Sequence, residues 1–337
     1  MTTAPGVAAS PRPGERPGAR RRRRATDEPR AVRILLIATA LLLLFVFLVL
    51  PLAVVFFEAF GLGRVIDRVA AGTMPLGQAV RTSLRAYWSA VAAGPTWEAV
   101  RLTLVTAAIA VPLNVVFGIA AAWAVTKFDF RGKSLLLALI DVPFAISPLV
   151  AGLALILLFG EGGPLGSVLG RSYDVGLFGL GFTFTVPRVV FALPGIVLAT
   201  VFITFPFVAR ELIPLMQAQG TDEEQAARAL GAGGWQTFRR VTVPNIKWGL
   251  LYGVILCNAR AMGEFGAVYA VANGFQSQRT LPLHIAMLEQ QNVVNMVPVF
   301  AVSSLLAVLA VVTLVVKTMV EWRFRAELNA RRRGTGL

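Results

Sequence analysis

Six long apolar stretches, almost free of charge, limit what this chain can fold into. A helix that crosses a membrane needs about 20 mostly apolar residues, because a rise of 1.5 Å per residue must cover roughly 30 Å of hydrocarbon. Four of the stretches contain no charged side chain. The six are Ile34–Phe57, Leu102–Thr126, Leu135–Gly160, Val189–Ala209, Trp248–Ala272 and Asn292–Val316. We expect an all-α, polytopic membrane helix bundle with six transmembrane helices.

Composition and charge agree with a protein whose main solvent is lipid. Of the 337 residues, 56% are hydrophobic and only 15% are charged, against about 25% in a soluble domain. The net charge of +14 could also indicate nucleic-acid binding, but much of it lies in residues 1–33 and from Lys317 to Arg333. These segments flank apolar stretches, so the rule that positive loops stay inside explains them better than a nucleic-acid partner does.

The same rule predicts the topology. The link Lys127–Ser134 is basic and therefore cytoplasmic, which also places both termini and the Arg210–Lys247 loop on the cytoplasmic side of the cell membrane. The glycine-rich loop Gly160–Arg188 and the loop around His284 then lie outside. We expect four parts: residues 1–33, a disordered basic tail; 34–96, the first transmembrane helix and an outer loop with an interfacial helix near Val80–Val91; 97–320, the transmembrane domain; and 321–337, a basic cytoplasmic tail.

Several kinds of site are excluded by single residues. Cys257 is the only cysteine and His284 the only histidine, so the chain has no internal disulfide framework, no His-rich metal site and no His-based catalytic triad. The string Gly132-Lys133-Ser134 lacks the first glycine of a phosphate-binding loop, because Lys127 stands there. We therefore expect no enzyme activity and no cofactor in this chain.

The most informative segment is polar and lies between the fourth and fifth stretches. Thr221 followed by Glu224 predicts a capping box that starts a helix over Asp222–Leu230. Gly231 permits the positive φ at which a helix ends, and a second short helix is expected over Trp235–Val241, ending before Pro244. This helix-turn-helix begins with acidic residues and carries little base-reading chemistry, so it indicates a docking site for a protein rather than for DNA.

This segment resembles the cytoplasmic "EAA" loop of the permeases of bacterial ABC importers, whose pattern is Glu-Ala-Ala, three residues, Gly, nine residues, then Ile-x-Leu-Pro. Gln225 stands where the family has Glu, with Glu224 just before it, which puts an ionic contact of the motif glutamate in doubt. The resemblance implies an ATPase-coupling role for Glu224, Gln225, Ala226, Ala227, Gly231, Val241 and Pro244, with Val243 at the second aliphatic position.

Other segments narrow the resemblance to the sulfate/thiosulfate permeases, and less closely to molybdate permeases. They are DVPFAISPLVAGL from Asp141, FVARELIPLM from Phe207, GWQTFRRVTVPNIKWGLLYG from Gly234 and NARAMGEFGAV from Asn258. The resemblance covers about residues 97–325. It implies a type I ABC importer permease fold, a second homologous permease subunit, a dimeric cytoplasmic ATPase that binds ATP and magnesium, and an extracytoplasmic sulfate-binding protein.

Charged residues inside the predicted spans are the candidates for a transport pathway or for a structural ion pair. Arg260 and Glu264 stand four residues apart on one helix face, where each can neutralise the other's charge. A role of Arg260, with Asn258 nearby, in attracting an anion stays open beside the structural role. Asp141 is a better helix cap or hydrogen-bond partner between helices than a ligand, because a carboxylate repels an oxyanion.

Two more questions stay open from the sequence. Pro51, Pro112, Pro143, Pro148, Pro194 and Pro206 lie inside the spans, either as packing kinks or, best for Pro143 and Pro148, as breaks that line a path. The alternatives to a sulfate importer are a molybdate or tungstate importer, an ion-driven secondary transporter and an ion channel. The chain shows neither the inverted repeat of many secondary transporters nor a selectivity-filter string.

Overall fold

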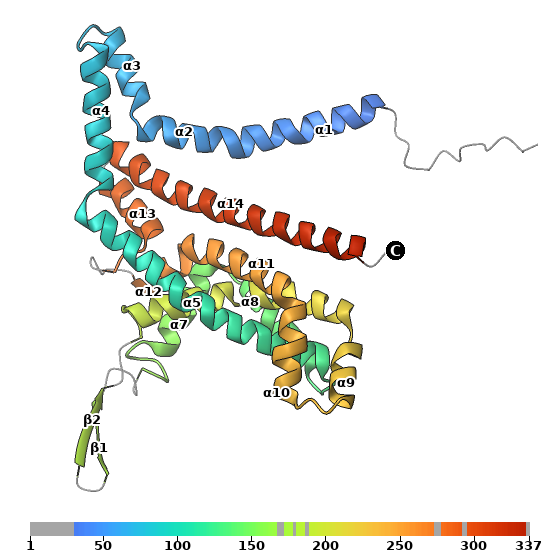
Figure 1. Ribbon diagram of the computed structural model, residues 1–337. Helices are drawn as coiled ribbons and strands as arrows, with labels where there is room; N and C mark the ends of the chain where they lie inside the picture. Colours follow the sequence, from blue (N-terminus) through green and yellow to red (C-terminus); the bar gives the residue numbers. More distant parts are fainter. Residues whose placement is uncertain are drawn as a thin grey trace, which may run out of the picture. The chain divides into compact units, whose positions relative to one another are not determined.

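A computed structural model describes residues 30–166, 172–177, 180–185, 189–272, 278–291 and 295–334. Its elements, in chain order, are α1 (Arg30–Leu44), the π-helical turn η1 (Phe45–Val49), α2 (Leu50–Ala59), α3 (Leu62–Ala70), α4 (Leu76–Val91), α5 (Gly94–Lys127), α6 (Lys133–Ala145), α7 (Pro148–Phe159), β1 (Ser172–Leu177), β2 (Leu180–Thr185), α8 (Leu193–Gln219), α9 (Asp222–Ala229), α10 (Gly234–Thr237), the π-helical turn η2 (Phe238–Thr242), α11 (Val243–Met262), α12 (Gly266–Ala272), α13 (Leu281–Gln291) and α14 (Val297–Gly334) (Figure 1).

The expected membrane bundle is confirmed, but two of the six spans are each divided into two helices with a bend between them. Four helical segments are long and apolar enough to cross a membrane: Arg30–Ala59, Gly94–Lys127, Leu193–Gln219 and Val297–Arg323. Two further pairs reach that length only together, α6 with α7 and Gly234–Met262 with α12, and they bend by 111° and 49°. Six spans follow if each bent pair is counted as one.

The chain divides into two compact units, Met1–Leu52 and Ala53–Leu337. Most of the tail expected over residues 1–33 lies outside the described residues, but its last residues, from Arg30, already belong to α1. The bundle described below belongs wholly to the second unit.

The loops at the expected outer side contain more regular structure than we predicted. The segment Gly160–Arg188 holds an antiparallel hairpin, in which Ser172 pairs with Thr185 and Leu177 with Leu180. Where an interfacial helix was expected near Val80, α4 forms, and its Tyr87 hydroxyl lies 3.2 Å from Ser304 Oγ of α14.

Prolines in the spans are accommodated in three ways. Pro112, Pro143 and Pro206 lie inside α5, α6 and α8, where they interrupt no helix. Pro148 and Pro194 lie in the first turns of α7 and α8, where a missing N–H costs nothing. Pro51 is the second residue after the π-helical turn η1, and Leu50 between them donates its N–H to Phe45 O, one residue farther back than in an α-helix.

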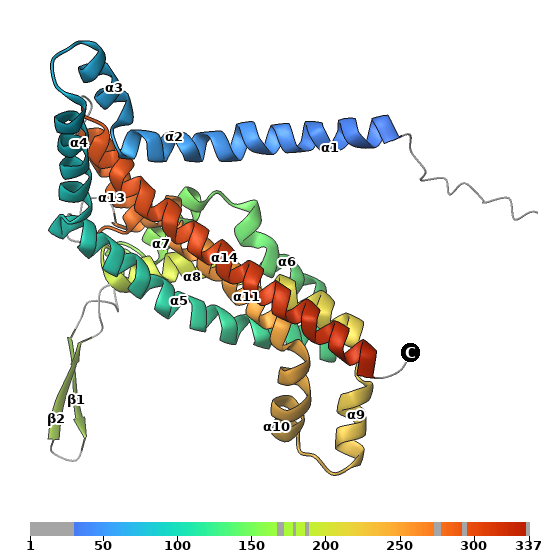
Figure 2. The ribbon, with the colours of Figure 1, turned by 45° about the horizontal axis from the view of Figure 1, so that its top comes forward.

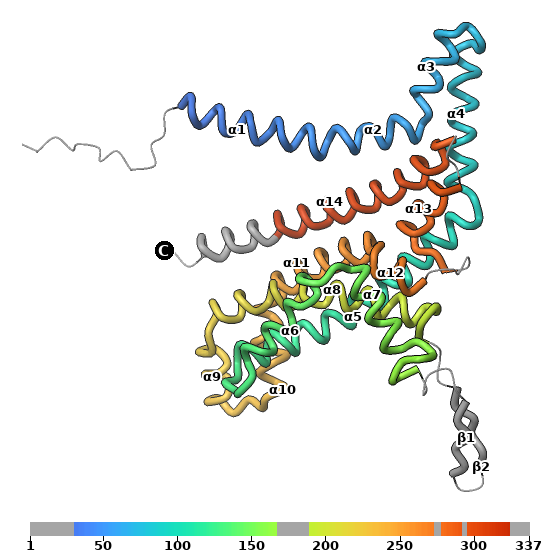
Figure 3. The backbone as a smooth tube through the Cα atoms, turned by 180° about the vertical axis from the view of Figure 1, so that it is seen from behind, coloured from blue at the N-terminus to red at the C-terminus, as the bar shows by residue number. Residues whose placement is uncertain are grey.

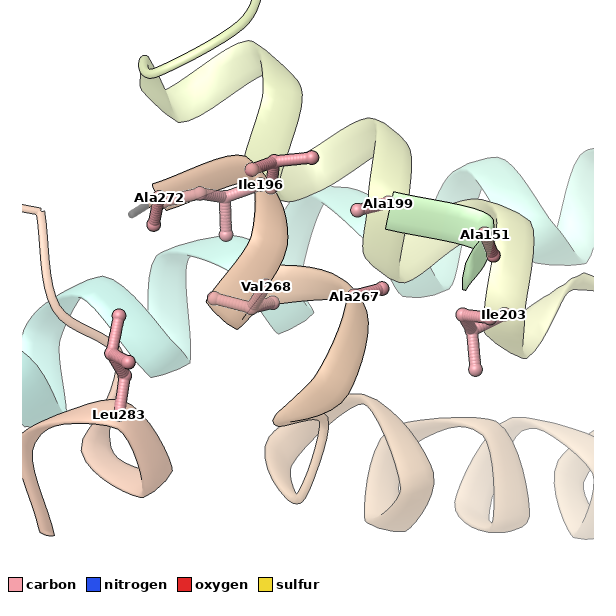
Figure 4. Packing of buried hydrophobic residues seen from close by; sticks show 9 residues of the cluster. Ala151, Ile196, Ala199, Ile203, Ala267, Val268, Ala272 and Leu283 are labelled. Atoms are coloured by element: carbon pink, nitrogen blue, oxygen red, sulfur yellow. The ribbon is translucent and has the colours of Figure 1, made fainter. Parts of the chain in front are cut away.

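The helices meet where small residues let backbones approach. A Cβ on Gly152 of α7 would lie 2.6 Å from Ala270 Cβ and 2.7 Å from Ala267 O of α12. A Cβ on Gly118 of α5 would lie 2.6 Å from two side-chain atoms of Val208 in α8. These contacts surround a core that α7, α8, α12 and α13 share (Figure 4): Ala151, Ile196, Ala199, Ile203, Ala267, Val268, Val271, Ala272 and Leu283.

Candidate functional site

The polar segment forms a helical hairpin, α9 and α10, which projects from one end of α5, α8 and α11 (Figure 2). Gly231 has φ 88°, a left-handed conformation that L residues rarely adopt, so the predicted stop of the first helix is confirmed. The loop expected over Arg210–Lys247 is shorter than predicted, because α8 continues through Arg210 to Gln219 before the chain turns at Gly220.

Two predictions about this hairpin are wrong. Thr221 makes no side-chain cap to the helix backbone, and its Oγ1 instead accepts a hydrogen bond from Gln225 Nε2 at 3.0 Å. The second helix does not end before Pro244, because α10, η2 and α11 follow one another without a break. At the end of η2, Val243 N–H donates to Phe238 O, and this wider turn accommodates Pro244, the second residue after it.

Glu224 ties the hairpin to the end of α5. Its Oε2 lies 3.1 Å from Lys127 Nζ, and its Oε1 accepts a hydrogen bond from Thr242 Oγ1 at 2.7 Å. Lys127 Nζ also donates to Gly220 O at 2.6 Å. The side chains of Lys127 and Glu224 are only 8% and 17% exposed, so their charges are poorly screened. The neighbour of the motif position, not Gln225, therefore makes an ionic contact, and that contact lies within the chain.

Further contacts hold the hairpin against the bundle. Asn245 Nδ2 donates to Glu223 Oε2, and Asn245 O accepts from Gln219 Nε2 at 2.9 Å. The rings of Trp123 in α5 and Phe238 in η2 stack with centroids 4.6 Å apart. The hairpin is thus fixed to α5, α8 and α11 together.

The outer side of the hairpin is open. Leu230 is 90% exposed and Trp235 is 71% exposed, and both are large apolar side chains. Beside them lies a groove of about 300 Å³ lined by Ala227, Leu230, Gly231, Ala232, Gln236, Thr237, Arg240 and Val241. The motif positions Ala226 and Pro244 are also exposed. Polar contacts anchor one side of the hairpin, while the other presents an apolar surface with a basic residue at its edge.

Arg260 and Glu264 form the ion pair that their spacing predicted. Arg260 NH2 lies 2.8 Å from Glu264 Oε2, with Glu264 fully buried and Arg260 34% exposed. Glu264 Oε1 accepts the N–H of Ala267 at 3.0 Å, so the carboxylate also caps the start of α12. Asn258, two residues before Arg260, donates through Nδ2 to Met262 Sδ at 3.8 Å, a weak contact one turn along the same helix. Whether Arg260 serves the pathway or the packing stays a prediction.

Asp141 makes a contact that the sequence analysis did not name. Its Oδ1 accepts a hydrogen bond from Arg210 Nε at 2.8 Å, which joins α6 to α8. The guanidinium also lies 4.7 Å from the ring centroid of Phe144. We missed Arg210 because we placed it at the start of a cytoplasmic loop. The signal that could have found it is the apolar run Leu212–Met216, which continues the helix past it.

No group of three metal-ligating side chains that could hold an ion is found within the described ranges. His284 lies at the start of α13, where its Nε2 is 3.4 Å from Thr96 Oγ1. Burial, and secondarily the charge of Arg279, lower the pKa of His284 below its usual value.

Comparison with known proteins gives the family. Residues 114–326, which include the hairpin and both intramembrane ion pairs, match the family of binding-protein-dependent transport system inner membrane components. The chain belongs to this family.

Two relatives in this family are named as sulfate permeases. The "Sulfate transport system permease protein CysW" of Escherichia coli K12 is 50% identical over 227 residues, 67% of this chain and 73% of that protein. The protein of the same name from Synechocystis is 44% identical over 292 residues, 87% of this chain and 94% of that protein.

Among solved structures, a bacterial alginate ABC transporter in complex with an alginate-bound periplasmic protein has a TM-score of 0.62 at 15% identity. The match covers 87% of this chain and 94% of that one, and at this identity it supports the fold alone. The all-α permease fold expected from the sequence is therefore confirmed.

Proposed function

We propose that this chain is the membrane-embedded permease subunit of an ATP-driven importer for sulfate, and that it forms the translocation path with a second, homologous permease. The observation that carries this is the hairpin α9–α10: its inner side is fixed to three helices of the bundle, while its outer side exposes Leu230, Trp235 and a groove. Such a surface suits the binding of a partner protein that moves the hairpin and, through it, the membrane helices.

The partner at this surface is a dimeric cytoplasmic ATPase, which binds ATP and magnesium and hydrolyses the nucleotide. Small residues line part of the groove, so the surface of the ATPase can approach the backbone closely. The hairpin then marks the cytoplasmic side, and both termini share that side if the chain crosses the membrane six times. An extracytoplasmic sulfate-binding protein delivers the anion from the other side.

Sulfate is the substrate that the relatives support, since those compared above are named as sulfate permeases. A molybdate or tungstate importer, the alternative from the sequence, is not favoured by these relatives. An ion-driven transporter would leave the exposed hairpin without a role.

The test is reconstitution of the complete complex in proteoliposomes. We expect uptake of radiolabelled sulfate that requires ATP and the binding protein, and ATP hydrolysis that sulfate stimulates more than molybdate does. Uptake driven by a sodium or proton gradient without ATP would contradict the proposal, and stimulation by molybdate alone would contradict the substrate.

Gly231→Pro is the matched test of the hairpin. Proline fixes φ near −65° and cannot take the 88° of Gly231. We expect the variant to assemble in the membrane but to lose sulfate uptake. The control is Gly77→Ala, because nothing lies within 4 Å of a Cβ at that position. Alanine replaces proline in this control because Gly77 is helical and a proline would damage α4.

A further inference from the structure

The ion pair between Asp141 and Arg210 is deeper in the membrane than its place in the sequence indicates. Asp141 follows Lys133, the first residue of α6, by eight residues, which is about 12 Å along a helix. Arg210 adjoins Ala209, whose backbone N would lie 3.1 Å from a Cβ on Gly118 of α5. Gly118 precedes Lys127, at the end of α5, by nine residues, or about 14 Å. The pair thus lies about 12–14 Å from the ends of two helices, inside two of the candidate membrane spans.

At this depth both side chains are about half exposed, 53% for Arg210 and 50% for Asp141. A charged side chain that faces the middle of a lipid layer costs at least about 2.5–3.5 kcal/mol, so charges inside spans turn toward water or protein. The Arg260–Glu264 pair follows this rule by burying its carboxylate completely. The exposed side of the Asp141–Arg210 pair must therefore face a water-filled space or another subunit.

We propose that the Asp141–Arg210 pair lines the translocation path, and that the guanidinium of Arg210 contacts the oxyanion as it passes. The inference rests on the proposed function, because it takes sulfate as the ligand. It names the residues of this chain that the ligand meets.

The chemistry of the pair suits a passing dianion. A guanidinium has five N–H donors, and within the described residues the recorded hydrogen bond from Arg210 runs from Nε alone to Asp141. The terminal nitrogens can therefore donate to sulfate oxygens. Phe144, whose ring lies under the guanidinium, contacts Phe207 edge-on with centroids 5.3 Å apart, and this packing holds the cation in place.

Asp141 keeps this contact weak. It neutralises Arg210 when no anion is present, and it repels a bound anion, so sulfate enters without being trapped. Conduction needs a site that binds strongly enough for entry and weakly enough for release. An unpaired arginine would meet only the first condition.

The first experiment separates this role from a structural one. The double variant Asp141→Asn/Arg210→Gln replaces the ion pair by two amides that can still hydrogen-bond, and it leaves no buried charge. We expect normal assembly but at least tenfold lower sulfate uptake per assembled complex, and the same loss in Arg210→Gln. Wild-type uptake in the double variant would overturn the inference. Arg81→Gln, an exposed arginine of α4 outside the spans, is the control.

The single variant Asp141→Asn is measured by the KM and the maximal rate of uptake, and a purely structural role of Asp141 would not lower the KM. With Arg210 unbalanced, we expect both the KM for delivered sulfate and the maximal rate of uptake to fall several-fold. An unchanged KM with a lower rate would contradict the balancing role of Asp141.

The second experiment asks what the pair faces. Arg210→Cys, in a Cys257→Ala background, is treated in the assembled membrane complex with a membrane-impermeant anionic thiosulfonate. We expect modification that sulfate slows, with Arg81→Cys modified regardless of sulfate. A cysteine at 210 that does not react while the control does would show that lipid or the second permease covers this face, and would overturn the inference.

The two proposals fail differently. If the wild-type complex takes up no sulfate, the proposed substrate is wrong, and the accessibility of the cysteine at 210 still decides whether the pair lines a path. If the wild type takes up sulfate and Arg210→Gln does so equally well, only the role of Arg210 is wrong.

Discussion

Two membrane spans of this protein are bent, and the ion pair close to each bend differs in its exposure: one pair is half exposed, whereas the other has a buried carboxylate. Between α6 and α7 the chain turns by 111°, and between α11 and α12 by 49°. The second halves of both spans, α7 and α12, pack together at Gly152 (Figure 3). Each break interrupts helical hydrogen bonding inside the membrane, where freed backbone groups need partners from the protein.

The sharper break is made by proline. Ile146 is extended, and Ser147, which directly precedes Pro148, has φ −59° and ψ 136°, in the extended region that residues before proline favour. The charged pair near it, Asp141 with Arg210, is half exposed. The gentler break follows Gly263, and Glu264 there is fully buried, joined to both Arg260 and the N–H of Ala267.

The difference indicates a division of labour. We expect the buried carboxylate of Glu264, which caps α12, to fix the angle between α11 and α12, and the exposed pair to hold its charges where a solute can reach them. The gentler span also continues directly from the hairpin α9–α10, because α10, η2 and α11 are consecutive, so movement of the hairpin reaches this span through the backbone itself.

The strongest test of this division is to remove one charge from the buried pair. Breaking a buried pair costs on the order of 3–5 kcal/mol, whereas removing both partners can be nearly neutral. We expect Arg260→Met and Glu264→Leu each to lower the amount of assembled complex severely, and the double variant to recover much of it. The measurement is assembled complex by size-exclusion chromatography in detergent.

Transport by that double variant decides the role of Arg260. Wild-type sulfate uptake per assembled complex would show that the pathway does not need Arg260. Normal assembly with lost uptake would contradict the structural role of Arg260. Both bent spans would then carry an ion pair that transport requires.

The next largest effect is expected from a substitution in the contact between α7 and α12. A Cβ at position 152 would lie 2.6 Å from Ala270 Cβ, closer than real Cβ atoms come, and overpacking of this kind costs about 1–3 kcal/mol. We expect Gly152→Ala to lower the melting temperature of the complex by several degrees. Gly77→Ala, a helical glycine with open space around it, should leave it unchanged or slightly higher. Equal effects would show that α7 and α12 move apart freely.

The ion pair between Lys127 and Glu224 offers a test of whether movement of the hairpin is transmitted to the span α10–α12. A hydrogen bond to a charged group contributes about 1.5–3 kcal/mol, so its loss should loosen the hairpin from α5 without unfolding the bundle. We expect Lys127→Met to lower sulfate uptake per ATP hydrolysed by several-fold. Lys133→Met, which removes a pair with the fully exposed Asp129, is the control and should be near neutral. Unchanged coupling in Lys127→Met would leave the hairpin's attachment to α5 without function.

The smallest expected effect concerns His284, whose helix α13 packs against α5 and α14 rather than against either break. Its pKa is lowered by burial and by the charge of Arg279, so the folded protein holds the ring neutral. The unfolded chain binds a proton at about pH 6.5, and the folded protein therefore loses stability as the pH falls below that value. We expect the thermal stability of His284→Gln to depend less on pH between 7 and 5 than that of the wild type. An equal slope would place the acid sensitivity elsewhere.

Much of this architecture follows from the sequence because it depends on local patterns. Uncharged runs of more than 20 residues can only be spans, and Gly231 after an acidic, alanine-containing helix can only be a stop followed by a turn. The pairing of Arg260 with Glu264 is also local, since residues four apart share a helix face. These features would survive in any tertiary arrangement of the helices.

What the sequence left undecided was settled by contacts between distant segments. Glu224 fits a capping box by its spacing, yet it turns away because Lys127, at the end of another helix, offers a charge at 3.1 Å in a poorly hydrated place. Arg210 resembles a loop residue until α8 is seen to pack along Gly118 of α5, which sets its depth. Spacing along one helix fixes what a side chain can reach locally, but the energy of a charge depends on which partners and how much water the neighbouring helices leave around it.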